Sequence, residues 1–235
     1  GVEVQPLKQM NGHASFNQVF FTDAQVPAEN LVGRVGDGWK VAVTTLAHER
    51  RGADGLRPPS KKGSVRTGRI HAEEQKELET ANQPYTWYPQ RAGRVDLILD
   101  RAKETGANTD PHARQEIAKL MIMAKSAEWT ARRARAAQRQ GRPQGPEGSL
   151  GKLAASNVAR AAAHVHTVMT GADALLTGTE SPRDGVIAEI LVSVPAISIA
   201  GGTDEIQRNI ISERVLGLPK EPRFDTGPFR DVRKN

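Results

Sequence analysis

The 235-residue sequence predicts a mainly α-helical fold, in which an antiparallel helical bundle follows a few β-strands. Ala and Arg dominate the composition, which favours helices. Apolar residues recur at three- and four-residue steps in several long segments after residue 110. Short connections separate these segments, so we expect neighbouring helices to run antiparallel and to pack as a bundle.

Residues 1–36 are predicted to hold strands. Segments 1–7 and 16–23 have the composition of strands, and Val26-Pro27 then turns the chain. Two or three strands do not form a stable sheet alone. We therefore interpret this region as the terminal strands of an incomplete β-domain, completed either by residues outside the sequence or by another polypeptide.

Residues 37–218 are predicted to form the helical bundle, and residues 219–235 a polar tail. Asp37 is a suitable N-cap for the first helix, which contains Glu49 and is expected to end near Gly52. Residues 53–90 show no sustained period, because Pro and Gly interrupt them, and are predicted to be an irregular insertion. The later helices are expected to begin near Asp110, Ser149, Pro182 and Thr203.

Composition and charge exclude several kinds of site. The absence of Cys rules out disulfides and thiolate chemistry. The net charge of +6 suits an anionic ligand or nucleic acid, but much of the excess lies in residues 61–69 and no nucleic-acid motif accompanies it. His164 and His166 are two residues apart and would face different sides of a helix, so no metal site is predicted. The apolar stretch 185–202 contains Glu189 and Pro195, and we interpret it as a buried helix with a connector, not a membrane span.

Two motifs give the sequence a family resemblance. They are Gly201-Gly202-Thr203-Asp204-Glu205-Ile206-Gln207-Arg208 and, far upstream, Leu46-Ala47-His48-Glu49-Arg50-Arg51-Gly52. Together they resemble the C-terminal half of a flavin-dependent acyl-CoA dehydrogenase, in which the first strands would end the middle β-barrel. The resemblance implies FAD, an acyl-CoA substrate and an electron-transferring flavoprotein or similar acceptor. It also implies a homo- or hetero-oligomer, dimer or tetramer, in the cytoplasm.

The resemblance also implies where the catalytic base lies. In this family the residue two before the motif's Thr usually supplies the carboxylate that removes the α-proton, but here that residue is Gly201. Other members have the carboxylate just before an Arg on the helix that leaves the β-domain, where this chain has Glu49 and Arg50. Glu49 is therefore the expected base, with Arg50 orienting it or bracing the helix on the substrate side. The backbone at Gly201, with Gly202 beside it, is expected to hold the thioester oxygen.

The flavin contacts implied by the resemblance are incomplete. Gly171, Thr203 and Glu205 are the expected cofactor-binding residues. The family's Arg with a nearby Phe-Gly, which reaches a neighbouring flavin pyrophosphate, has no recognisable match between residues 53 and 108. Similar departures occur in actinobacterial steroid-degrading acyl-CoA dehydrogenases, which assemble from two unlike chains. The sequence thus leaves two functions open: an enzyme subunit that acts on a branched or bulky acyl chain, and a non-catalytic partner subunit.

Overall fold

A computed structural model describes residues 1–55, 68–69, 72–73, 89–142, 145–222 and 229–232. Within α1 and at residue 147, some side chains also lie outside the described part, among them those of Glu49 and Arg50. The chain divides into two compact units, Gly1–Tyr88 and Pro89–Asn235. Each is described by itself.

The first unit begins with an antiparallel hairpin of β1 (Val2–Leu7) and β2 (Phe16–Phe21), which confirms the predicted strands. Val2 stands opposite Phe21, and Val4 opposite Val19. Cross-strand partners and alternate residues share a face, so these four apolar side chains lie together on one side of the hairpin. All four are exposed in the structure.

Helix α1 (Gly38–Gly55) follows in the same unit. The Asp37 carbonyl accepts the Val41 N–H at 3.1 Å, so the helix begins where the sequence predicts. It continues past the predicted end at Gly52, because one Gly costs a helix only about 1 kcal/mol and does not stop it. Residues 53–55 are therefore helical, and most of the predicted insertion lies outside the described residues. The division of the chain at residue 36 stays a prediction.

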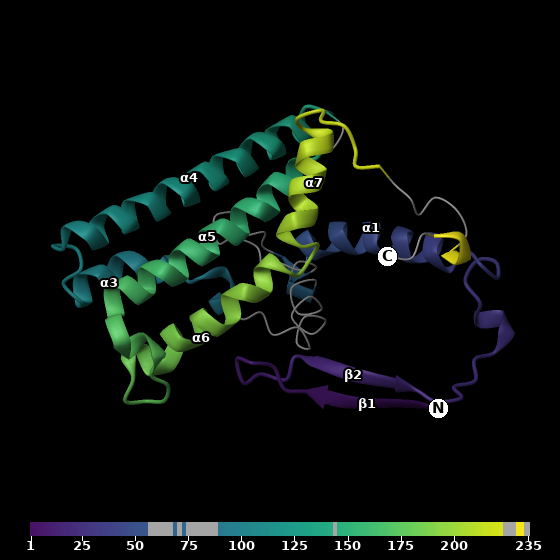
Figure 1. Cartoon of the computed structure of the whole chain (residues 1–235), viewed down its shortest axis with the longest axis horizontal. Helices are drawn as coiled ribbons and strands as arrows, with labels where there is room; N and C mark the ends of the chain where they lie inside the picture. Colours follow the sequence, from purple (N-terminus) through teal and green to yellow (C-terminus); the bar gives the residue numbers. More distant parts are fainter. Residues whose placement is uncertain (56–67, 70–71, 74–88, 143–144, 223–228, 233–235) are drawn as a thin grey trace. The chain divides into compact units, whose positions relative to one another are not determined.

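The second unit is an antiparallel helical bundle, which confirms the predicted fold class (Figure 1). Helix α4 (Pro111–Arg139) starts at the predicted cap, where Asp110 Oδ1 accepts the Ala113 N–H at 2.7 Å. Helix α5 (Glu147–Thr170) packs against α4, α6 (Val186–Ser193) and α7 (Asp204–Arg214). It is therefore the central helix of this unit.

Short elements before α4 complete the bundle and were not predicted. They are the 3-10 turns η2 (Pro89–Ala92) and η3 (Val95–Leu97) and helix α3 (Ile98–Glu104). Ile98 packs in one core with Leu120 of α4 and Val165 of α5. Gly93 allows this close packing, because a Cβ there would lie 2.7 Å from the Ala159 carbonyl oxygen of α5.

The connection into α6 differs from the prediction. Pro182–Gly185 forms the 3-10 turn η5, in which Arg183 and Asp184 have φ values of 55° and 54°. This left-handed backbone does not continue into an α-helix, so α6 begins at Val186 and not at Pro182. The Arg183 guanidinium pairs with Glu104 of α3 and ties the turn to the bundle. Among the described residues, no helix is long and apolar enough to cross a membrane.

Candidate functional site

The candidate site is the turn that joins the 3-10 segment η6 (Val194–Ser198) to α7. Gly201 and Gly202 have φ values of 68° and 91°, a region that favours glycine. Thr203 then caps α7, because its Oγ1 accepts the Ile206 N–H at 3.3 Å. The sequence-predicted turn and helix start are thus confirmed.

Among the described residues, the carbonyls of the two glycines have a hydrogen-bond partner, whereas their N–H groups have none. Gln207 Nε2, which belongs to a buried side chain, donates to the Gly201 carbonyl at 3.4 Å and to the Gly202 carbonyl at 3.2 Å. Within the described residues, the N–H groups of Gly201 and Gly202 have no hydrogen-bond acceptor. Both glycines are exposed, and they precede the positive end of α7. This arrangement suits a ligand oxygen that carries negative charge.

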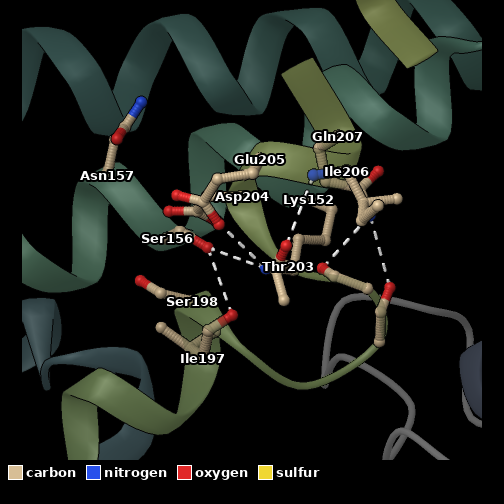
Figure 2. Close-up of polar contacts among 12 residues, drawn as sticks. Lys152, Ser156, Asn157, Ile197, Ser198, Thr203, Asp204, Glu205, Ile206 and Gln207 are labelled. Atoms are coloured by element: carbon tan, nitrogen blue, oxygen red, sulfur yellow. Dashed lines mark hydrogen bonds and ion pairs between the residues drawn. The ribbon is translucent and has the colours of Figure 1, made fainter. Parts of the chain in front are cut away.

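A buried carboxylate anchors the start of α7. The side chain of Asp204 accepts a hydrogen bond from Lys152 Nζ at 3.1 Å (Figure 2). It also accepts one from Arg160 Nη1 at 2.6 Å, and the residue is 3% exposed. Burial would raise the pKa of Asp204, but hydrogen bonds from Arg160 and Lys152 outweigh it and hold the pKa well below its usual range. Asp204 is therefore charged and paired with two cations of α5.

Helix α5 also contacts the residues that precede the two glycines. Lys152, Ser156 and Arg160 stand four residues apart, and we name them the α5 row. Ser156 Oγ accepts from Lys152 Nζ at 3.2 Å and donates to the Ile197 carbonyl at 3.2 Å (Figure 2). Arg160 also donates to the Ser198 hydroxyl. One face of α5 thus holds the chain both before and after the two glycines.

Comparison with known proteins decides the family. The model of the acyl-CoA dehydrogenase C-terminal domain matches residues 91–216, more than half of the chain. The chain belongs to the acyl-CoA dehydrogenase family.

A curated relative and two solved structures agree with this assignment. Acyl-CoA dehydrogenase IpdE1 of Mycobacterium tuberculosis is 31% identical over 232 residues, covering 95% of this chain and 49% of that protein. A solved structure described as Tcur3481-Tcur3483 steroid ACAD has a TM-score of 0.66 at 17% identity, covering 94% of this chain and 50% of that one. The ChsE4-ChsE5 complex from Mycobacterium tuberculosis has a TM-score of 0.57 at 20% identity, covering 94% and 51%. These structures share the fold, and the chain spans about half the length of the relatives it matches.

The structure brings together only some of the site residues that the sequence predicts for this acyl-CoA dehydrogenase chain. Gly201 and Gly202 form the turn before α7, Thr203 caps that helix, and Glu205 lies in its first turn. Gly171 instead follows the far end of α5, about 27 Å of helix from Lys152. Glu49 and Arg50 belong to α1, and the roles predicted for their side chains stay predictions.

Glu205, predicted to bind the cofactor, is exposed at the first turn of α7. Its carboxylate lies 3.5 Å from Arg208 Nη1 on the same helix. Its own backbone N–H and the Thr203 hydroxyl lower the pKa of Glu205. A negative group at a helix N-terminus is favourable, so the local structure explains this residue without a ligand.

The sequence missed the polar residues that hold the start of α7 in this acyl-CoA dehydrogenase bundle. Asp204 and the α5 row were given no role, although a polar residue every fourth position on an apolar helix was the available signal. The prediction that the two histidines face different sides is confirmed, because His164 is exposed near Glu116 and His166 is fully buried. Burial lowers the pKa of His166 to about 4, and its Nε2 lies 3.3 Å from the Arg94 carbonyl oxygen. His166 is therefore a neutral core residue.

Proposed function

We propose that this chain contributes the C-terminal helical domain of an FAD-dependent acyl-CoA dehydrogenase, which converts a bulky acyl-CoA to its 2-enoyl-CoA. The observation that supports this proposal best is the pair of exposed glycines before α7, whose N–H groups have no acceptor among the residues that the structure describes. In the reaction, the α-carbon gives up a proton and the β-carbon a hydride, and a double bond forms between them.

The turn would act on the thioester. As the α-proton leaves, negative charge develops on the carbonyl oxygen. N–H donors fixed before the reaction stabilise such charge without reorganising. We assign this role to the backbone of Gly201, with Gly202 beside it. The role needs no side chain at either position.

Glu49 is the proposed base. Proton removal requires one carboxylate within reach of the α-carbon. Gly201 has no side chain to supply it, and Glu49 stands at the alternative position known from the family resemblance. Arg50 would orient the Glu49 carboxylate on the substrate side.

Some of the proposed flavin contacts fit an incoming group. A Cβ on Gly171 would meet no atom within 4 Å, so this backbone has room for a ligand. Thr203 and Glu205 stand at the exposed start of α7. When bound, FAD accepts the hydride from the β-carbon. Because Gly171 lies apart from the α7 turn, we assign the two places to different parts of the flavin or to flavins of neighbouring subunits.

The relatives support a proposal for the substrate and the partners. One matching structure is described as a steroid ACAD, and another is a complex of two named chains. We propose a branched or ring-bearing acyl-CoA as substrate and an unlike partner chain. The electron acceptor would be an electron-transferring flavoprotein or a similar protein, in the cytoplasm.

The second candidate function is a non-catalytic partner subunit. The lack of the family's pyrophosphate-binding Arg pattern between residues 53 and 108 favours it. In that case the partner chain would supply the base, and this chain would supply helices and contacts to the flavin.

One experiment separates the two functions. The full-length protein is purified with its partner chain, and its flavin content, bleaching by acyl-CoA without oxygen and enoyl-CoA product are measured. An active complex that loses turnover with Glu49→Gln in this chain supports the enzyme. An active complex indifferent to that substitution supports the partner subunit, and a complex without any such activity contradicts both.

A further inference from the structure

We propose that Lys152, Ser156 and Arg160 of α5, together with Asp204, are positioning residues that hold the Gly201-Gly202 turn in the geometry that binds the thioester oxygen. This inference rests on the proposed function of the turn. None of these four side chains would touch the substrate. They would act through the backbone that they fix.

These four residues, which we call the clamp, attach both ends of the turn to helix α5. On the side of η6, Ser156 donates to the Ile197 carbonyl, and Arg160 donates to Ser198. On the side of α7, Lys152 and Arg160 both donate to the Asp204 carboxylate. Only residues 199–203 lie between the two attachment points, and this short segment contains the two glycines. Its conformational freedom is therefore limited from both sides.

Glycine makes such a clamp necessary. A Gly-Gly pair has more conformational freedom than any other dipeptide and loses more entropy when it is ordered. N–H donors stabilise a developing charge only if they already point at it. Within the turn, Gln207 donates to the two glycine carbonyls, which sets the direction of the peptide planes that carry the Gly202 and Thr203 N–H groups. The α5 row sets where that turn stands on the bundle.

The charges of the clamp suit this role. A buried carboxylate with two cationic partners is held by charge-assisted hydrogen bonds, which are stronger than neutral ones. Lys152 is mostly buried, whereas the Arg160 side chain is 43% exposed. Removal of Lys152 would leave Asp204 with one cation that solvent reaches. We expect the start of α7 to shift as a result.

The test compares two ligands that differ at the thioester carbonyl. The probes are 2-octenoyl-CoA and S-(2-octenyl)-CoA, a thioether that lacks the carbonyl oxygen, and their Kd values for the full-length flavin-loaded complex are measured by calorimetry. A misplaced donor loses affinity only for the thioester. We expect Lys152→Met to weaken thioester binding about tenfold and to leave thioether binding unchanged, because small misplacements cost one to two orders of magnitude. Loss of folded protein would lower the number of binding sites for both probes equally.

The controls make the outcome decisive. Lys125→Met removes an exposed lysine paired with Glu128 on α4 and should change neither Kd. Lys152→Arg keeps the cation and should retain most of the thioester preference. If Lys152→Met does not fold, Arg160→Gln at the more exposed end of the row replaces it. If Lys152→Met, or Arg160→Gln in its place, keeps the full thioester preference, the clamp is overturned but the proposed function still stands. A wild-type complex without thioester preference contradicts the proposed role of the turn and the clamp together.

Discussion

The side-chain amide of Gln207 donates to the Gly202 carbonyl at 3.2 Å, and the same nitrogen would lie 2.7 Å from a Cβ placed on Gly202. Gly202 also has a φ of 91°, which side chains disfavour. We therefore expect Gly202→Ala to lower the free energy of unfolding by about 1–3 kcal/mol. Gly201→Ala is the matched control, because a Cβ there meets no atom within 4 Å and only the backbone strain of ~1–2 kcal/mol applies, without the contact to Gln207. Urea unfolding of both variants checks this, and equal losses would contradict it.

Glu49→Gln should reduce enoyl-CoA formation by roughly a hundredfold or more, the scale of a lost general base, while the flavin stays bound. Initial rates and flavin absorbance of the full-length complex provide the measurement. Glu73→Gln removes an exposed carboxylate paired with Arg69 in the same unit and should keep the wild-type rate. Turnover that survives Glu49→Gln would remove Glu49 from the mechanism.

Adding Gly201→Glu to the Glu49→Gln protein should restore part of the activity. The exposed Gly201 has open space where a Cβ would stand, and its φ of 68° is accessible to other residues at a cost of ~1–2 kcal/mol. A carboxylate there would approach the same carbon from the family's usual position. The same addition with Gln in place of Glu is the control, because it has the same size and no basic group. Equal rates for the two double variants would show that position 201 does not reach the substrate.

Bulky acyl-CoA substrates should be preferred over straight chains. The absent side chain at Gly201 leaves room beside the reacting carbons, and one missing group changes pocket fit by ~1–3 kcal/mol, or about tenfold to a hundredfold in kcat/KM. The measurement compares octanoyl-CoA, isovaleryl-CoA and a CoA ester of a steroid side chain, with the steroid ester expected to be best. A higher kcat/KM for octanoyl-CoA would refute the spatial argument even if Glu49 proves to be the base.

The stability of the bundle should fall as the pH decreases from 6.5 towards 4. Burial lowers the pKa of His166 to about 4 in the folded protein, so over this range the unfolded chain binds a proton that the folded protein does not bind, and the unfolded state is stabilised. The full effect is about 3 kcal/mol, since one pKa unit corresponds to ~1.4 kcal/mol. Chemical unfolding across this range should show a slope that His166→Gln flattens. An unchanged slope in His166→Gln would assign the effect to other groups.

Local signals in the sequence predicted much of the fold. Asp110 and Thr203 cap their helices through the hydrogen bonds that their residue types indicate. The strands of the hairpin also lie where the sequence predicts them. Helix α3 was missed because a helix of seven residues is too short to show a period. The left-handed Arg183 was missed because neither it nor the preceding Pro182 indicates that backbone, which Glu104 on another element stabilises.

The candidate site was predictable only in part. The two glycines and the helix that follows them predict the turn at Gly201. The clamp does not, because Lys152 and Asp204 are 52 positions apart and only the packing of α5 on α7 joins them. An isolated sequence shows each of these residues as an ordinary surface charge. Burial in the bundle gives them their partners.

The spacing of the α5 row constrains how this region can vary. Lys152 and Arg160 are separated by two helical turns, about 12 Å, and both must face the loop on the neighbouring element. A single inserted or deleted residue between them would rotate one end by about 100° and carry it off the loop. A substitution in the row removes only the contacts of one side chain, whereas a change in the length of this stretch moves one whole end of the row away from its partners. The number of residues between positions 152 and 160 of α5 therefore sets the position of a loop that belongs to other elements.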